Sequence, residues 1–345
     1  VLHTMTLRDE FYPVGKLPQE DLLTLLRQQD LKDPRVILGP GLGHDAAVID
    51  FGDRHLVTKS DPITFATDEI GWYAAQVNAN DIACLGAKPR WFVATVLLPE
   101  KKTDGALVET IFDQIHTGCV EVGAVLVGGH TEITYGLHRP IVVGAMFGDV
   151  HPDELVRSDG AQPGDVLLLT KGIAIEGTAL LAREVRDRLA DHLDRERLDR
   201  AAGFLHDPGI SVVQDAAVIT AHGEVHAMHD PTEGGVATGL HEMLGAAGVG
   251  AVIDEAALPV LPETAAICEM LSLDPLGLIA SGALLASVAP EDAEAITAGL
   301  ADAGIKAAVI GEVQEAPAVV VKTADGDERP LRRFARDEIA RLFES

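Results

Sequence analysis

Basic residues are scarce in this chain. It carries 27 lysines and arginines against 54 aspartates and glutamates, which gives a formal net charge of −27. Nonspecific binding to nucleic acid needs a positive surface that neutralises phosphates, and adsorption to an anionic membrane needs the same. The charge balance therefore predicts no nucleic-acid partner and no membrane partner.

Long apolar runs are also missing. No stretch approaches the roughly 18 consecutive apolar residues that a membrane-spanning helix needs. The first residues, from Val1 to Met5, do not show the basic and then apolar pattern of a secretory signal. We therefore expect a cytoplasmic protein.

Cysteine is rare. The three cysteines, Cys84, Cys119 and Cys268, lie far apart, and none belongs to a Cys-x-x-Cys pair. This spacing excludes a disulfide framework and the common zinc motifs. We expect each thiol to pack as a small apolar group and to take no part in catalysis.

The chain is long enough for two domains, since 345 residues exceed the usual size of one. Stretches typical of strands alternate with stretches typical of helices, which predicts an α/β or α+β architecture. Turn-forming residues gather at 151–165, the best candidate for a boundary. We place the domains at residues 1–157 and 158–345.

Hydrophobic periodicity locates several elements within these domains. Helices are expected at residues 18–29, 71–85, 103–122, 233–246 and 332–343. Strands are expected at residues 90–98, 124–127, 140–150 and 281–285.

A glycine-rich loop precedes the first buried strand. Gly39, Gly41 and Gly43 lead to Asp45, and the apolar stretch 46–49 follows. Glycine lets the backbone approach a ligand closely, and successive amides in such a loop can face an anion. Asp45 could then hold a divalent cation. The alternative is a surface turn with a solvated aspartate.

Two further acids lie in structured segments. Asp61 follows a strand expected at 55–59, and Asp81 lies in the helix expected at 71–85, beside Asn78 and Asn80. Asn and Asp are poor residues for a helix interior. Three of them together indicate a polar task on one face, although an internal cap or a bend is the alternative.

A glycine pair follows the strand expected at 124–127. Gly128 and Gly129 precede His130, Thr131 and Glu132. We interpret the pair as a turn that delivers polar side chains at a strand end, where α/β proteins bind ligands.

A second glycine pair opens the helix expected at 233–246. Gly234 and Gly235 follow Asp230 and Thr232. The amides and the positive dipole end of a helix N-terminus suit a phosphate. The alternative, an ordinary N-cap by Asp230 or Thr232, is compatible with this role.

Acid-bearing segments thus recur along the chain, and together they indicate a site for a hard cation and phosphates. Mg²⁺ prefers oxygen ligands and binds a few carboxylates together with substrate phosphates. The chain contains no Walker GxxxxGK[ST] and no protein-kinase signature. If Asp45, Asp61 and Asp81 share a cation, Asp45→Asn should leave the metal-free fold unchanged or slightly more stable.

Five motifs in a fixed order resemble one known superfamily: AIR (aminoimidazole ribonucleotide) synthase, HypE, selenophosphate synthetase and thiamine-monophosphate kinase. The overall pattern is most similar to HypE-like AIR-synthase-related proteins, from about residue 15 to residue 313. The motifs are Gly43-His-Asp45-Ala-Ala-Val, Lys59-Ser-Asp61, Asn80-Asp81-Ile-Ala-Cys-Leu-Gly86-Ala-Lys-Pro89, Gly128-Gly-His-Thr131 and Asp230-Pro-Thr-Glu-Gly-Gly235.

The resemblance implies an α+β, AIR-synthase-like two-domain fold. Its N-terminal mixed sheet would form a barrel with that of a second copy, and its C-terminal domain would be α/β. ATP would bind with Mg²⁺ in a cleft near the dimer interface. The implied metal ligands are Asp45, Asp61 and Asp81, the implied catalytic residues are Asp45, Asp81 and His130, and the implied nucleotide-binding residues are Gly41, Gly43, Asp61, Asn80, Gly128, Gly129, Thr131, Asp230, Gly234 and Gly235.

Departures from the relatives leave the acceptor open. HypE ends in a cysteine, whereas this chain ends at Ser345 with no cysteine beyond Cys268. His130 and Glu233 stand where HypE has Asp and Arg, and His44 stands where an acid is common. We expect a Mg-ATP-dependent enzyme that activates an oxygen of an unknown acceptor, in a maturation or biosynthetic pathway. The alternatives are a small-molecule kinase and a non-catalytic ATP-binding maturation partner, as in hydrogenase maturation.

Overall fold

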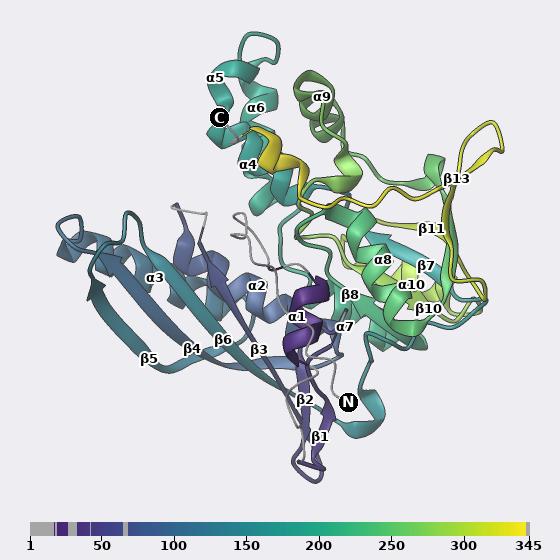
Figure 1. The fold of residues 1–345 in the computed structure, drawn as a ribbon, viewed down its shortest axis with the longest axis horizontal. Helices are drawn as coiled ribbons and strands as arrows, with labels where there is room; N and C mark the ends of the chain where they lie inside the picture. Colours follow the sequence, from purple (N-terminus) through teal and green to yellow (C-terminus); the bar gives the residue numbers. More distant parts are fainter. Residues whose placement is uncertain (1–16, 18, 27–32, 42, 65–67, 343–345) are drawn as a thin grey trace, which may run out of the picture.

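The computed structural model describes residues 17, 19–26, 33–41, 43–64 and 68–342. These residues form two mixed sheets with helices packed on them, which confirms the predicted α+β class. Figure 1 shows the first sheet on the left and the second on the right, with a group of helices at the top centre of the view. Among the described residues, no helix has both the length and the apolar character that crossing a bilayer requires.

The first sheet has the strand order β1-β2-β3-β6-β4-β5. Its neighbours are antiparallel except for β4 and β5, which are parallel and are joined through α3 (Gly105–Glu121). The expected strands at 90–98 and 140–150 and the expected helix at 103–122 are confirmed. The strands are β1 Val36–Leu38, β2 Ala47–Asp50, β3 His55–Ile63, β4 Lys88–Pro99, β5 Val125–Thr134 and β6 Ile141–Val150.

Helix α2 (Ile70–Cys84) is buried on nearly every side. A Cβ at Gly144 of β6 would lie 2.4 Å from Nδ2 of Asn78, and one at Gly148 would lie 2.3 Å from Cγ2 of Ile82. Two glycines four residues apart therefore let the helix lie directly on the strand. The opposite side of α2 contacts α7 (Val213–His222) of the second half (Figure 1).

The second sheet has the order β13-β12-β9-β11-β7-β10-β8, and only β9 and β12 pair in parallel. Its strands are β7 Val166–Thr170, β8 Val225–His229, β9 Gly250–Asp254, β10 Leu285–Val288, β11 Ala307–Gln314, β12 Val319–Lys322 and β13 Glu328–Pro330.

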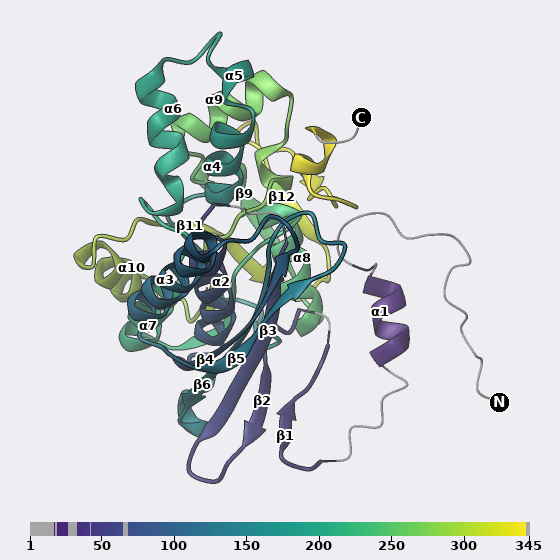
Figure 2. The same ribbon diagram turned by 90° about the vertical axis from the view of Figure 1, so that its left-hand side faces the viewer.

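Helices cover this second sheet, and several of them form the group at the top of the molecule in Figure 2. That group consists of α4 (Ile175–Glu184), α5 (Arg186–Leu189), α6 (Arg195–Ala202) and α9 (Pro262–Leu271). The remaining helices are α1 Gln19–Leu26, α8 Gly235–Ala247 and α10 Ala293–Asp302, with short 3₁₀ turns at Pro152–Glu154, Gly203–Leu205, Glu255–Ala257, Pro275–Gly277 and Glu338–Leu342.

One hydrophobic core extends across both halves. It joins Ile82 of α2 and Met146 of β6 to Val212, Ile219 and Leu284 of the second half. The connection at 151–165 is therefore a turn-rich link in the chain, while the buried apolar surface continues from one half into the other.

The glycine pair at Gly128 and Gly129 corrects one sequence prediction. It does not end a strand, because β5 runs on from Val125 to Thr134. Gly129 has a positive φ of 151°, and a Cβ there would lie 1.9 Å from the carbonyl oxygen of Ala94. Glycine is needed at this point so that β5 can lie close to β4.

Two other segments also differ from their patterns. Within the expected terminal helix at 332–343, only a 3₁₀ turn at Glu338–Leu342 forms, and residue 343 lies outside the described residues. Phe334, in the first part of that segment, lies against Gly277. The strand expected at 281–285 begins only at Leu285 because Gly282 has a φ of 106°. Of the helix expected at 18–29, residues 18 and 27–29 lie outside the described residues.

Candidate functional site

Acidic side chains from both halves meet at the junction between the two sheets. Asp45 precedes β2, Asp61 lies on β3, Asp81 lies near the end of α2, and Asp230 follows β8. Asp45, Asp81 and Asp230 are buried, whereas Asp61 is partly exposed. The fold thus brings together four acids that are separated by up to 185 positions in the sequence.

Asp45 is held by a buried histidine. Nδ1 of His229 donates to Oδ1 of Asp45 at 2.7 Å, and Nε2 of His229 lies 3.4 Å from the Glu242 carboxylate. Gly43 has a φ of 68°, and a Cβ there would lie 2.7 Å from the carbonyl oxygen of Glu242. The glycine therefore lets the loop lie against α8 and sets the position of Asp45.

Lys59 joins the next two acids. Its Nζ donates to Oδ1 of Asp81 at 3.0 Å and lies 3.2 Å from Oδ2 of Asp61. Asn78 fixes the strand here, because its Oδ1 accepts from the backbone N–H of Asp61 at 2.8 Å. One ammonium thus bridges two of the predicted metal ligands.

Asp230 lies on the other side of Asp45. One potential ligand atom each from Asp45, His229 and Asp230 falls within 4.8 Å of the others. The thiol of Cys84 lies 3.5 Å from Oδ1 of Asp230. This group therefore gathers two carboxylates around one imidazole.

The carboxyl groups show the effect of this crowding. Burial raises the pKa of Asp230 to about 7, and the charge of Asp45 adds to the shift. Burial also raises the pKa of Asp81 well above its usual range; Lys59 opposes this shift, and Asp230 adds to it. Excess negative charge among hard oxygen ligands is the environment that suits a divalent cation, so the residues present fit Mg²⁺.

The two basic groups of the site stay protonated. Burial opposes the charge of Lys59, but Asp81, Asp61 and Asp45 raise its pKa above its ordinary value. Burial likewise opposes the charge of His229, while Asp45 raises the pKa of the imidazole well above its usual range.

Residues of β5 lie apart from this cluster within one chain. Asp61, Gly144, Ala94 and Gly129 form one row across β3, β6, β4 and β5. Three strand spacings separate Asp61 from Gly129, about 14 Å. The same edge strand also carries Gly128, His130 and Thr131. His130 is exposed, and its Nε2 lies 3.4 Å from the Glu132 carboxylate.

Asn80 connects the two halves. It is fully buried; its Nδ2 donates to the Ile210 carbonyl at 2.8 Å, and its Oδ1 accepts from the Val212 amide at 2.9 Å. Both polar atoms of the predicted nucleotide-binding residue are thus engaged by backbone of the second half.

The start of α8 is occupied by a carboxylate. The Gly234 amide donates to Oδ2 of Asp337 at 2.7 Å, and the Gly235 amide donates to the Thr232 carbonyl at 3.0 Å. The amide of Gly234, which the sequence predicted to bind a phosphate, therefore already donates to a carboxylate of the same chain.

In the glycine-rich loop, a Cβ at Gly41 would lie 2.6 Å from Nδ1 of His44.

Sequence reasoning missed His229 and Lys59 as parts of the site. His229 directly precedes Asp230, and Lys59 lies two positions before Asp61. That proximity was the only available signal. No sequence signal pointed to Asp337, because this residue lies in a segment that was expected to be helical.

The three thiols are buried. Burial raises the pKa of Cys119 to about 11 and that of Cys268 to about 12, and it raises the pKa of Cys84 well above its usual range. All three are therefore protonated near neutral pH, which agrees with the expectation of small apolar packing groups.

Comparison with known proteins gives consistent matches along the chain. The model for AIR synthase related protein, N-terminal domain, matches residues 43–150, and that for AIR synthase related protein, C-terminal domain, matches residues 162–323. Carbamoyl dehydratase HypE of Cupriavidus necator is 37% identical over 268 residues, which are 76% of this chain and 72% of that protein.

Solved structures show the same similarity. The crystal structure of hydrogenase maturation protein HypE in complex with ATP is 26% identical, has a TM-score of 0.70, and covers 92% of this chain and 95% of its own. ThiL complexed with AMPPCP and TMP is similar in fold, at 19% identity and a TM-score of 0.70, over 91% of this chain and 97% of its own.

Proposed function

The chain belongs to the AIR synthase related family, and from this we propose that it is a Mg-ATP-dependent enzyme that activates an oxygen of an acceptor by phosphoryl transfer. Membership confirms the predicted resemblance and the AIR-synthase-like fold. The observation that carries the proposal is the convergence of Asp45, Asp81 and Asp230 from both halves into one buried, negatively charged group. A HypE relative that binds ATP supports it.

In this proposal Asp45, Asp61 and Asp81 hold Mg²⁺. The bound ion would neutralise charge on the phosphates. Lys59 balances part of the carboxylate charge in the protein itself, since its Nζ contacts both Asp61 and Asp81. His229 orients Asp45 through the 2.7 Å hydrogen bond, so that the carboxylate keeps one position before the ligand arrives.

A homodimer paired through β5 is part of the proposal. This edge strand exposes Val125, Val127 and Ile133, which are 62%, 56% and 55% exposed. A long apolar edge strand is a template for pairing with another chain. Pairing would cover these side chains and carry the Gly128–Thr131 segment, with His130, toward the site of the second copy.

We also place the domain division at residues 1–157 and 158–345. The two sheets lie on either side of this division, and the two family matches end at residue 150 and begin at residue 162. A protein that uses ATP and a diffusible or protein-bound acceptor is best placed in the cytoplasm. Localisation of a tagged chain in fractionated cells would test this.

Two alternatives predict different turnover. A small-molecule kinase would release ADP in proportion to a phosphorylated product. A non-catalytic maturation partner would bind ATP and release no ADP with any acceptor. Measuring ADP release with and without candidate acceptors separates the three.

Calorimetric titration of ATP with Mg²⁺, and again with excess EDTA, tests the metal assignment. If the carboxylates bind nucleotide through a divalent ion, affinity should fall at least tenfold in EDTA, about 1.4 kcal/mol. Equal affinity in the two conditions would overturn the assignment of Asp45, Asp61 and Asp81.

A further inference from the structure

Lys59 faces the proposed metal ligands because of the alternation of side chains along β3. Successive residues of a strand point to opposite faces, so Val57, Lys59 and Asp61 share one face. Val57 is fully buried there, whereas Ser60 and Pro62 of the other face are exposed. Lys59 therefore points toward α2, which packs against this strand, and 24% of its side chain is exposed.

Helix α2 holds the strand in place beside Lys59. Asn78 and Asp81 lie three positions apart in the helix, so they share one of its faces. Oδ1 of Asn78 accepts from the N–H of Asp61 at 2.8 Å, and Nδ2 of Asn78 donates to the Asp61 carbonyl at 3.3 Å. These two bonds fix the strand against the helix, with the carboxylates of Asp61 and Asp81 both within reach of Lys59.

The ammonium group of Lys59 joins these two carboxylates. Its Nζ donates to Oδ1 of Asp81 at 3.0 Å and lies 3.2 Å from Oδ2 of Asp61. The contacts engage one oxygen of each carboxylate, and each carboxylate has a second oxygen that could bind an ion. Lys59 thus lies where a cation shared by Asp61 and Asp81 would lie.

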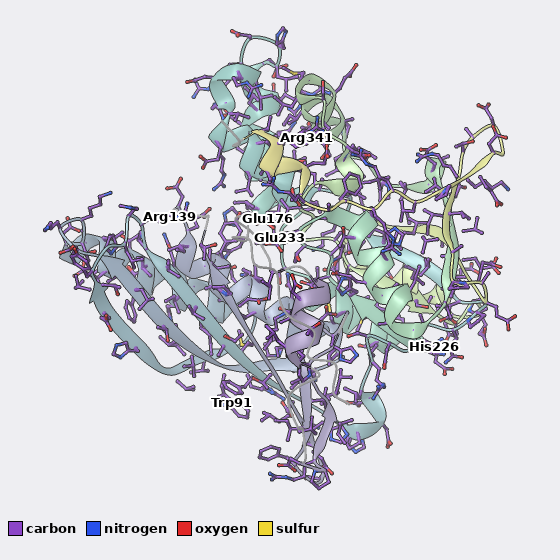
Figure 3. All side chains as sticks on the ribbon, in the orientation of Figure 1. Trp91, Arg139, Glu176, His226, Glu233 and Arg341 are labelled. Atoms are coloured by element: carbon purple, nitrogen blue, oxygen red, sulfur yellow. The ribbon has the colours of Figure 1, made fainter. Side chains whose placement is uncertain are left out.

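Other acids lie along the same junction. Figure 3 shows Glu176 of α4 and Glu233 on the side of the second half that faces the first sheet. Burial lowers the pKa of Lys59, but the charges of the three proposed metal ligands, with Asp81 contributing most, raise it above its ordinary value. The ammonium therefore belongs to the proposed metal ligands by charge as well as by contact.

A second metal ion would compete with this ammonium for the same oxygens. Two-metal sites for phosphoryl transfer hold their cations about 3.5–4 Å apart, and Mg²⁺ binds oxygen at about 2 Å. An ion shared by Asp61 and Asp81 would have to displace Nζ of Lys59, because two positive groups in that space repel each other.

We propose that Lys59 is a built-in cation that takes the place of a second divalent ion, so that each chain binds one divalent cation. The second oxygens of Asp61 and Asp81, together with Asp45, hold that ion. Because ATP can carry one Mg²⁺ into the site, the chain needs no further Mg²⁺. This inference rests on the proposed function, and in it Lys59 acts through the carboxylates that it positions.

An ordinary structural ion pair is the alternative. It would stabilise the fold and would not decide how many ions bind. Loss of Lys59 lowers stability in either case, since Asp61 and Asp81 would then repel each other. The number of bound ions is therefore the measurement that separates the two.

The test uses two variants and one matched control. Lys59→Met removes the charge and keeps a side chain of similar length, whereas Lys59→Arg keeps the charge. Lys322→Met is the control, because Lys322 is exposed on β12 of the second half. The probe is Mn²⁺, titrated into a one-to-one mixture of protein and the ATP analogue AMPPCP. Calorimetry counts the bound ions, and electron paramagnetic resonance shows whether they are neighbours.

The unmodified protein, K59R and K322M should each bind one Mn²⁺ per chain and give the spectrum of an isolated ion. K59M should bind two, and ions about 4 Å apart should show spin coupling. Without nucleotide, Mn²⁺ should raise the melting temperature of K59M more than that of the unmodified protein, because the ion replaces the missing positive charge.

Two Mn²⁺ ions per chain in the unmodified protein would overturn the inference, and this count needs no variant. A folded K59M protein that binds only one ion would show that Lys59 makes an ordinary ion pair. Lys59→Gln is a second neutral variant in case K59M does not fold. Failure of the proposed function looks different, because the unmodified protein would then bind neither Mg-ATP nor Mn²⁺ with AMPPCP.

Discussion

Asp45 illustrates how a single residue can serve binding and folding at once. Its carboxylate belongs to the proposed metal site and also pairs with buried His229. We predict that Asp45→Asn weakens Mg-ATP binding at least tenfold, about 1.4 kcal/mol. We also predict a loss of about 3 kcal/mol of folding stability, because a protonated buried imidazole loses its counter-charge. Calorimetry and denaturant unfolding of the same sample measure both.

This expectation for Asp45 differs from the one that the sequence alone supports. Without knowledge of His229, removal of one repelling charge predicts an unchanged or slightly more stable metal-free fold. Asp53→Asn is the matched control, because Asp53 is exposed in the turn after β2. An Asp45→Asn protein with unchanged affinity would refute the metal assignment, and one with unchanged stability would refute the structural importance of the His229 pair.

Among secondary-structure elements, α2 depends on its polar side chains. Asn80 satisfies two backbone groups of the second half, the Ile210 carbonyl and the Val212 amide. We predict that Asn80→Ala costs about 2 kcal/mol or more of unfolding free energy, since two buried backbone groups lose their partner. Denaturant unfolding measures this loss.

Asn80→Asp refines the test, because it keeps an acceptor for Val212 and removes the donor to Ile210. Its stability should lie below that of the unmodified protein. A loss below about 0.5 kcal/mol in the alanine variant would show that water replaces both bonds.

The edge strand β5 supports a prediction about assembly. Val127→Glu places a charge on the exposed apolar edge and should convert a dimer to a monomer at micromolar concentration, because like charges would meet across the new pairing. Light scattering gives the mass. Val309→Glu is the control, because Val309 is an exposed residue of β11 in the second half, and this variant should remain dimeric. A monomeric unmodified protein would contradict the proposed homodimer.

The same elements show what the sequence could and could not predict. Periodicity located β6 and α3 because a half-buried strand and an amphipathic helix repeat a local pattern. The partner of Asn80 was not predictable, because Ile210 lies 130 positions away and contributes only backbone atoms. Gly128 and Gly129 gave the same signal as a turn, although their role is a close approach of two strands.

In the candidate site, motif order was the informative feature. It selected Asp45, Asp61, Asp81 and Asp230, which the fold brings to one junction. It could not show that Lys59 bridges two of them, because a lysine two positions from an aspartate on a strand is common and carries no geometric information.

For the whole molecule, raised carboxyl pKa values predict how stability depends on pH. Glu176 and Asp337 have folded-state pKa values of about 7 and about 6, against unfolded values of about 4. Groups shifted in this direction bind protons more tightly in the folded state. Their contribution to the free energy of unfolding is full below about pH 4 and is lost as pH rises to about 7.

We therefore predict that the melting temperature of the ligand-free protein falls as pH rises from about 5 to about 8. Differential scanning calorimetry across this range measures the fall. Glu176→Gln should flatten the curve, because it removes the group with the larger shift. An identical slope in that variant would show that Glu176 is not protonated in the folded protein near pH 6.

The position of α2 also has a consequence for motion. The helix is buried between the first sheet and α7, and the core that contains it continues into the second half. Its backbone amides should therefore exchange with solvent deuterium only when the entire protein unfolds. A ligand that binds beside α2 stabilises the folded protein against unfolding. It would therefore slow the exchange of every amide in the helix by the factor that corresponds to its binding free energy, including at residues that it does not contact.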